Sequence, residues 1–308
     1  MENRDRHLWG IILAGGNGKR LQVFIRSLYC DDRPKQYCTF IGTRSMIRHT
    51  VDRAGMLIPS DRLMAIVNRD HLKFVEEQLG DLPPENVIVQ PYCRDTGPGI
   101  LLPLLHVARR DPEAVVVLLP SDHFIIDEEK FMGCVGRASE FAFNNPESPV
   151  IIGVDPEYPE TEYGWIERGT ELLRESEATF HRVERFWEKP DESIARMLMN
   201  RRFLWSTLIL VGRADTLLEY FQIYTTVLYN FFQKINSGIG TANEERIVES
   251  VFASVPSVNF SSGLLERIPE HLCVMRAAGV RWSDWGDPLR IEHDITRLGK
   301  VLQKGAYA

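Results

Sequence analysis

The sequence predicts a protein of the α/β class, in which helices flank a sheet of buried, mostly parallel strands. Two observations lead to this prediction. Along the first half of the chain, short runs of apolar residues alternate with longer amphipathic stretches. The short runs are apolar throughout, which is typical of strands covered on both faces, and segments of helix length separate them. A length of 308 residues also allows a large buried core.

The elements of the first half follow from this alternation. Strands are expected at residues 8–13, 62–67, 87–89, 114–119 and 149–154. Helices are expected at residues 45–56, 70–79, 99–109 and 128–143. Strands that alternate with amphipathic helices in this way favour β-α-β units.

The pattern changes after residue 155. Two shorter, alternating runs at residues 164–168 and 180–187 are joined by a polar stretch at 171–177, which indicates a β-ribbon or a lid-like insertion. A helix is expected at 191–200 with Asp191 near its N-cap, then a strand at 207–211. Further helices are expected at 215–234 and 243–253, and a late strand at 272–276. Without a repeat or a flexible linker, one composite domain is expected.

Composition excludes several classes of protein. The net charge of −7 has the wrong sign for a protein that neutralises a nucleic-acid backbone. No apolar run reaches the roughly 18 to 20 residues of a membrane span. Residues 1–7 are polar rather than signal-like, so a cytoplasmic location is expected. Five cysteines without a Cys-x-x-Cys pair argue against a disulfide framework and a thiolate zinc site, and they are expected to be reduced.

A glycine-rich loop follows the first strand. Gly15, Gly16 and Gly18 allow a tight turn, and successive backbone amides there can point at phosphate oxygens. Arg20 adds a positive charge at the rim of this expected anion site and can bind phosphate with two hydrogen bonds. The loop matches neither a P-loop, because Leu13 stands where a glycine is needed, nor the dinucleotide fingerprint. An ordinary glycine-rich turn remains an alternative for the loop taken alone.

A series of further motifs decides between these alternatives. They lie at residues 15–21, 33–36, 119–123, 163–164, 186–190 and 282–286. In order and approximate spacing, this series resembles the sugar-1-phosphate nucleotidyltransferases over nearly the whole chain. Residues 90–98 and 159–164 are most similar to the guanylyltransferase branch of that family.

The resemblance implies a mixed, mostly parallel Rossmann-like sheet flanked by helices, the nucleotide-diphospho-sugar transferase fold. It implies a single nucleotidyltransferase domain over residues 1–308, with nucleotide binding in about 1–155 and sugar binding in about 156–308. Because the chain stops at Ala308, neither a C-terminal β-helix nor an isomerase domain is expected. The implied reaction joins GTP and mannose 1-phosphate and releases pyrophosphate.

Such a reaction needs charge neutralisation more than proton transfer, because the attacking group is already a phosphate anion. By resemblance, Arg20 and Lys35 are catalytic, and Mg²⁺ is the expected cofactor, held by Asp122 and Asp284. The resemblance assigns nucleotide binding to Leu13, Ala14, Gly15, Gly16, Gly18, Asp95, Pro120 and Ser121. It assigns sugar-phosphate binding to Gly164, Glu188, Lys189 and Ser206. Several of these residues also have a structural alternative: a helix cap for Asp122, a turn residue for Asp284, an exposed lysine beside a turn proline for Lys35, and a solvated pair for Glu188 and Lys189.

Departures from the family pattern keep other functions open. Lys19 replaces a usual threonine, and Ser206-Thr207-Leu208 replaces a usual Asn-Ser-Gly stretch. Alternatives are therefore another base or sugar, such as glucose 1-phosphate, or a catalytically weak nucleotide-sugar-binding regulatory protein. An oxidoreductase that uses a dinucleotide is less consistent with the broken glycine fingerprint. The aromatic residues between 220 and 232 predict core packing or an oligomer contact, and a homodimer is one expectation.

Overall fold

A computed structural model describes residues 5–174 and 178–303. Parts of two segments considered above, residues 1–4 of the polar N-terminus and 175–177 of the polar stretch, lie outside the described residues. In the described part of the chain, no helix combines the length and the apolar character that crossing a membrane would require.

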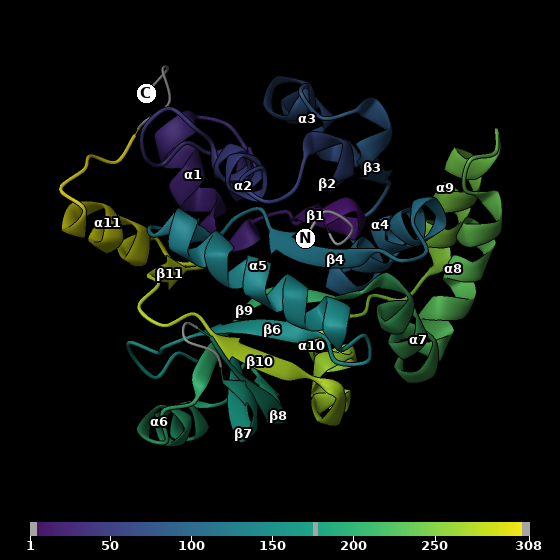
Figure 1. The fold of residues 1–308 in the computed structure, drawn as a ribbon. Coiled ribbons are helices and arrows are strands. Elements are labelled where there is room, and N and C mark those ends of the chain that lie inside the picture. The colour runs from purple at the N-terminus through teal and green to yellow at the C-terminus, as the bar shows by residue number, and fades with distance from the viewer. Residues whose placement is uncertain (1–4, 175–177, 304–308) are drawn as a thin grey trace.

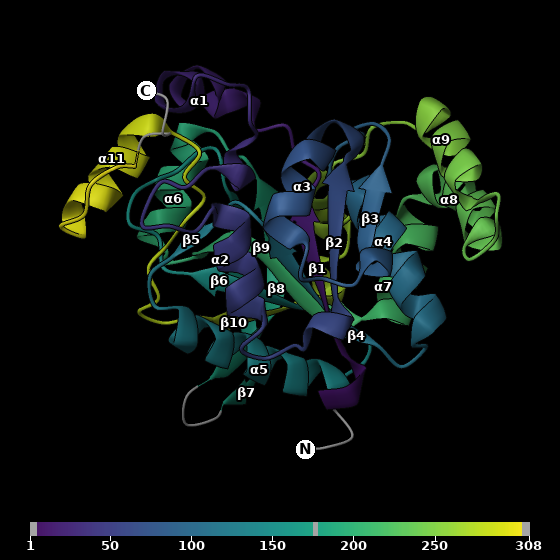
Figure 2. The same ribbon diagram turned by 90° about the horizontal axis from the view of Figure 1, so that it is seen from above.

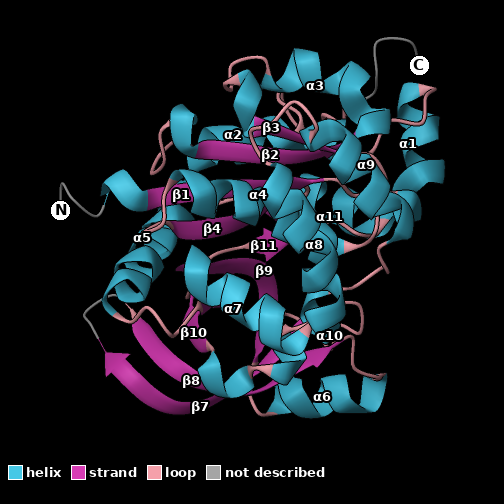
Figure 3. Cartoon of the chain, turned by 90° about the vertical axis from the view of Figure 1, so that its right-hand side faces the viewer, coloured by secondary structure: helices cyan, strands magenta, loops and turns pink. Residues whose placement is uncertain are grey.

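The centre of the fold is a mixed sheet with the strand order β3-β2-β1-β4-β9-β6-β10-β8-β7 (Figures 1 and 3). Its first strands are β1 (Leu8–Ala14), β2 (Leu63–Asn68), β3 (Val87–Gln90), β4 (Val115–Pro120) and β6 (Val150–Val154). The others are β7 (Gly164–Arg174), β8 (Thr179–Glu188), β9 (Leu204–Arg213) and β10 (Cys273–Arg276). Only β8 and β9 run against the rest, so the expected mixed, mostly parallel sheet is confirmed.

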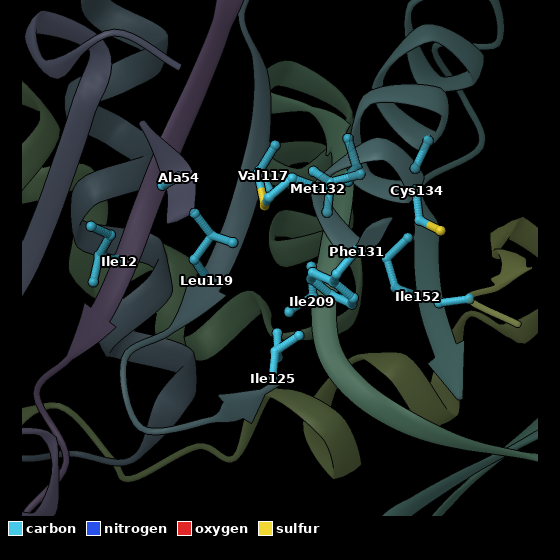
Figure 4. Packing of buried hydrophobic residues seen from close by; sticks show 14 of the residues in the cluster. Ile12, Ala54, Val117, Leu119, Ile125, Phe131, Met132, Cys134, Ile152 and Ile209 are labelled. Carbon is cyan, nitrogen blue, oxygen red and sulfur yellow. The ribbon is translucent and has the colours of Figure 1, made fainter. Parts of the chain in front are cut away.

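Helices cover both faces of this sheet (Figure 2). One face packs against α2 (Met46–Ala54), α3 (Leu72–Leu79), α5 (Glu128–Asn144) and α6 (Glu192–Asn200). The other packs against α4 (Thr96–Arg110), α7 (Ala214–Tyr224), α8 (Thr226–Gly238), α9 (Glu244–Ser254) and α10 (Phe260–Gly263). Figure 4 shows the first of these cores, where Phe131 and Met132 of α5 meet strand residues such as Val117 and Ile152. Because helices cover both faces of the sheet, the side chains on both sides of its central strands are buried, which explains why those strands are apolar throughout.

A third, smaller core joins the two ends of the chain. It contains residues of α1 (Gln22–Tyr29) and of α11 (Pro288–Arg297), together with Phe40 and Trp285. The ring of Trp285 stacks on Phe124 of the short strand β5 (Phe124–Ile125), which pairs with β11 (Trp282–Ser283). This core brings the loop after β11 next to the segment that follows β1 (Figure 2).

Two sequence expectations need correction here. The helix expected at 215–234 is two helices, because Thr225 has φ −128° and ψ 47° and its hydroxyl donates to the Phe221 carbonyl at 2.7 Å. The β-ribbon is confirmed, but it forms the edge of the main sheet rather than a lid, since β8 pairs with β10 and β7 with β9. The strand β7 continues to Arg174 and so includes the first part of the polar stretch.

The aromatic residues between 220 and 232 pack in the second core. Tyr220, Phe221 and Phe232 are buried there, and Tyr224, Tyr229 and Phe231 are partly buried against it. Core packing is the role that these contacts support, and the homodimer stays a prediction.

Candidate functional site

A cavity of about 450 Å³ opens at the carboxyl ends of β1, β3 and β4. Ligands of open α/β sheets bind at this edge. Its lining includes Leu13, Gly15, Gly16, Gly18, Asp95, Pro120, Ser121 and Asp122, which are the residues expected to bind nucleotide, apart from Ala14, and one of the expected metal ligands. Ser121 fixes the ends of β1 and β4 together, because its hydroxyl donates to the Leu13 carbonyl at 2.7 Å.

The side-chain amide of Gln36 fixes the backbone of the glycine loop. Gln36 is buried, and its Nε2 donates to the carbonyls of Ala14 and Gly16, both at 2.9 Å. Gly18 has φ 59°, a left-handed conformation that favours glycine, and a Cβ there would lie 3.0 Å from the Lys35 amide nitrogen. The Gln36 hydrogen bonds and the left-handed turn at Gly18 therefore fix the conformation of the glycine loop.

Gln90, at the end of β3, has a free acceptor in the cavity. Its Nε2 donates to the Gly15 carbonyl at 3.3 Å, whereas its Oε1 is buried without a hydrogen-bond partner. Unpaired buried acceptors are costly, so this oxygen is suited to receive an N–H donor from a ligand.

Lys35 and Asp122 form an ion pair beside the cavity. The lysine Nζ lies 2.8 Å from Asp122 Oδ2, and the lysine side chain is only 5% exposed. The same Nζ donates to the backbone carbonyl of Asp284. This burial excludes the alternative of a surface lysine. A helix cap is also excluded for Asp122, since Asp127 occupies the N-cap position of α5.

Asp284 is held by several donors. Its Oδ1 accepts from the Tyr163 hydroxyl at 2.7 Å and from Arg290 at 2.9 Å, and its Oδ2 accepts from Arg20 at 3.3 Å. Burial tends to raise the pKa of Asp284, but Lys35 and these hydrogen bonds outweigh it, so the pKa lies below its ordinary value. The carboxylate is therefore ionised at neutral pH.

Glu162 connects the remaining cations. Its Oε2 lies 3.5 Å from Arg20 Nη1 and 3.4 Å from Lys189 Nζ. Together with the ion pairs above, this gives a continuous series of polar contacts: Lys189, Glu162, Arg20, Asp284, Lys35 and Asp122. The five charged groups named from the sequence thus converge, although their segments are far apart in the chain.

The expected sugar-side residues form a neighbouring group and do not line the cavity. Gly164 pairs with Glu188 across the β7–β8 hairpin, and a Cβ on Gly164 would lie 3.2 Å from the Ser206 Cβ. Burial, the largest influence, raises the pKa of Glu188 above its ordinary value. Lys189, at the end of β8, is half exposed and pairs with Glu162 rather than with Glu188.

Asp95 reaches the cavity from the N-cap of α4. Its Oδ1 accepts from the Thr96 amide at 2.7 Å and from Asn259 Nδ2 at 3.2 Å. Asp95 has φ 69°, and three other non-glycine residues near the site, Lys189, Leu208 and Trp285, also have positive φ. Backbone strain of this kind concentrates at functional sites.

His123 follows Asp122 and is neutral at pH 7. Burial lowers its pKa to about 4, so the imidazole is neutral at pH 7. Its Nδ1 lies 3.3 Å from the Trp282 indole nitrogen, which can donate to it. This agrees with the structural role expected for the histidines.

Sequence reasoning missed the partners that orient the charged groups. Gln36, Gln90 and Tyr163 lie in the quoted motifs, but no role was assigned to them. Glu162 occupies a variable position within one motif. Arg290, which also pairs with Glu160, lies in a helix that the sequence analysis did not include, although Asp287 at the N-cap and Pro288 at the first helical position are a start signal for it.

A glycine loop at the carboxyl edge of the parallel strands, with cations and two carboxylates beside it, is typical of α/β proteins that bind phosphorylated ligands. Comparison with known protein families shows which family of such proteins the chain belongs to. The chain belongs to the nucleotidyl transferase family, whose model matches residues 9–289. The resemblance seen in the sequence is thereby confirmed.

Individual curated relatives have names that state a particular activity. The chain is 31% identical to mannose-1-phosphate guanylyltransferase of Escherichia coli K12, over 91% of this chain and 58% of the relative. It is 32% identical to the enzyme of the same name from Salmonella montevideo, over 90% of this chain and 57% of the relative. The chain thus spans less than two thirds of these curated relatives.

A solved structure described as mannose-1-phosphate geranyltransferase from Thermus thermophilus matches with a TM-score of 0.78. It is 24% identical and covers 91% of this chain and 77% of that one, which shows the shared fold.

Proposed function

We propose that this protein transfers a guanylyl group from GTP to mannose 1-phosphate, which gives GDP-mannose and pyrophosphate. The observation that carries the proposal is the continuous series of contacts from Lys189 through Glu162, Arg20, Asp284 and Lys35 to Asp122, which lines the glycine-loop cavity. A reaction between two polyanions needs this convergence of charge.

In this proposal, the glycine loop binds the triphosphate through backbone amides. Arg20 and Lys35 neutralise the charge that develops on the transferring and departing phosphates. Lys189 pairs with the phosphate of the sugar, which attacks the α-phosphorus. Because that phosphate is already an anion, no side chain has to remove a proton.

Asp122 and Asp284 fit a magnesium ion. Both carboxylates have pKa values below the ordinary value, despite burial, and are ionised. Among residues 5–174 and 178–303, no group of three or more metal-ligating side chains occurs. A pair of carboxylates suits Mg²⁺, which takes most other ligands from phosphates and water. When bound, the ion would neutralise phosphate charge.

The choice of GTP and mannose 1-phosphate rests on the names of the relatives. Two acceptors in the cavity support a base with N–H donors: the Asp95 carboxylate and the unpartnered Oε1 of Gln90. Guanine offers such donors at N1 and the 2-amino group. The assignment of nucleotide binding to about residues 1–155 and of sugar binding to 156–308 is part of the same proposal.

The test measures pyrophosphate release from a panel of hexose 1-phosphates, each with each of the four common nucleoside triphosphates and Mg²⁺. Product formed with GTP and mannose 1-phosphate, and weakly or not at all with other pairs, would support the proposal. A preferred pair with another base or sugar would correct its substrates. Binding of the nucleotide sugar without turnover of any pair would favour the regulatory protein.

A pair of variants tests the role of Arg20 in the proposed reaction. Arg20→Ala should lower turnover by about 10²-fold, because it removes a cation from the transition state. Arg26→Ala is the matched control, since Arg26 pairs with Asp32, away from the cavity. Equal turnover in both variants would remove Arg20 from the mechanism.

A further inference from the structure

The two carboxylate oxygens of Asp284 have unequal surroundings. Its Oδ1 accepts three hydrogen bonds: from the Tyr163 hydroxyl at 2.7 Å, from the Gly286 amide at 2.8 Å and from Arg290 Nη1 at 2.9 Å. A carboxylate oxygen has about two lone pairs to share, so these donors leave none on Oδ1 for a cation.

The second oxygen, Oδ2, stays accessible. Within the described part of the chain it has one donor, Arg20 Nη2 at 3.3 Å, and the Arg20 side chain is 55% exposed. An arginine so exposed can exchange this long contact for a phosphate oxygen. A Cβ on Gly286 would lie 2.5 Å from Oδ2, so glycine leaves space there that any side chain would fill. Asp284 can therefore meet a cation through Oδ2 but not through both oxygens.

Arg290 is itself held in place by the segment that carries Tyr163. The arginine lies in the first turn of α11, and its Nη2 pairs with the carboxylate of Glu160, whose side chain is only 8% exposed. Its Nη1 donates to the Tyr163 hydroxyl as well as to Asp284. Arg290 thus supplies one of the three donors to Oδ1 and supports a second.

We propose that Arg290 is a positioning residue that restricts Asp284 to coordination through one oxygen, and that the site therefore prefers Mg²⁺ to Ca²⁺. This inference rests on the magnesium site of the proposed function and deepens it. Mg²⁺ requires a small octahedral shell and keeps several waters in it, whereas Ca²⁺ takes about six to eight oxygens and can bind both oxygens of one carboxylate. A carboxylate with one oxygen already saturated suits the first ion and offers too few ligands to the second.

The experiment compares the wild type with Arg290→Met and with the double variant that combines Arg290→Met and Glu160→Gln. The double variant also removes the buried carboxylate that loses its partner, so it avoids the uncompensated charge that could unfold the single variant. Arg297→Met is the matched control, because Arg297 lies on the same helix, carries the same charge and pairs with Glu157 at 3.7 Å. Circular dichroism identifies the folded variants.

Electron paramagnetic resonance measures the binding of Mn²⁺ to each protein in the presence of GTP and without a sugar 1-phosphate. Competition by Mg²⁺ and by Ca²⁺ then gives the dissociation constant of each ion. We expect the ratio of the Ca²⁺ constant to the Mg²⁺ constant to exceed one in the wild type and in Arg297→Met. In the folded Arg290 variants the ratio should fall about ten-fold, because a lone pair of Oδ1 becomes available.

An unchanged ratio in these variants, or an equal fall in Arg297→Met, would overturn the role of Arg290. The proposed nucleotidyl transfer, measured separately by pyrophosphate release, would then stand. A wild type that binds no more Mn²⁺ than free GTP does would overturn the metal site and this inference with it.

Discussion

The ammonium group of Lys35 lies 2.8 Å from Asp122 Oδ2 and also donates to the backbone carbonyl of Asp284. A buried cation thus joins the two segments that carry the expected metal ligands. Burial, the largest influence, raises the pKa of Asp122, but the interactions with Lys35 and other neighbours outweigh it and keep the pKa below its ordinary value. Lys35 therefore helps to keep this carboxylate ionised.

Replacing Lys35 by methionine should remove this cation while it preserves most of the buried hydrocarbon chain. We expect kcat for nucleotidyl transfer to fall by about 10² to 10³, because a preorganised charge near the transferring phosphate is lost. Lys73→Met is the matched control, since Lys73 lies on α3 over the ring of Phe74. Values of kcat within two-fold of each other in the two variants would contradict this role.

Asp122→Asn tests the metal site independently of turnover. The neutral amide is a weaker ligand for a hard cation than a carboxylate, so the affinity for Mn²⁺, used as a spin probe in the presence of nucleotide, should fall about ten-fold or more. Magnesium-dependent activity should fall in parallel. Asp61→Asn, at an exposed position in a short helical turn, is the control. Unchanged Mn²⁺ affinity in a folded Asp122→Asn protein would exclude Asp122 as a ligand.

The fold was largely predictable because burial on two faces leaves a plain signal in the sequence. The run at residues 115–119, for example, is apolar throughout, and β4 is buried along its whole length. The strands β5 and β11 were not predicted, because two residues each carry no periodicity. The break at Thr225 was also missed, since apolar residues continue on both sides of it and the change is in the backbone.

The site was predictable where its residues lie in contiguous motifs. The glycine loop and the segment at 120–122 form one cavity wall, because both follow directly from neighbouring parallel strands. Contacts such as Glu162 with Arg20, or Arg290 with Asp284, depend on tertiary packing through the third core. No spacing in the sequence encodes that packing, so these partners could be found only in the structure.

Stability should depend on pH through His71. Burial, the largest influence, lowers the pKa of His71 below its ordinary value of 6.5 and outweighs a hydrogen bond to Ala14 and the charge of Asp70. The folded state therefore keeps a neutral imidazole, whereas the unfolded chain takes up a proton as the pH falls through about 6.5. The stabilising contribution is complete above that pH and is lost progressively below it.

The measurement is urea unfolding of the wild type and His71→Gln between pH 7.5 and 5. The free energy of unfolding should fall with decreasing pH in the wild type, by up to about 1.4 kcal/mol per pH unit from this group. His71→Gln should show a shallower slope, because glutamine does not titrate. The exposed His293 provides the control variant His293→Gln. Parallel slopes for His71→Gln and the wild type would contradict the prediction.

The last prediction concerns a buried ion pair between α2 and α5. Arg53 Nη1 lies 2.9 Å from Glu128 Oε1, and the arginine side chain is only 2% exposed, against 26% for the glutamate. In Glu128→Gln the guanidinium stays buried without a counter-charge, because the glutamine amide and the Thr50 hydroxyl can accept hydrogen bonds from it but are neutral. We expect a loss of about 2 to 3 kcal/mol in the free energy of unfolding, because an uncompensated buried charge is costly.

Urea unfolding at neutral pH measures this loss, and Glu129→Gln, the exposed neighbour on the same helix, is the control. The double variant Arg53→Met with Glu128→Gln distinguishes the cost of the unpaired Arg53 charge from the cost of altered packing. Because methionine removes the buried charge as well, the double variant should be more stable than Glu128→Gln alone. If Glu128→Gln were as stable as Glu129→Gln, the guanidinium would not depend on this carboxylate, and the ion pair would contribute nothing to the packing of α2 on α5.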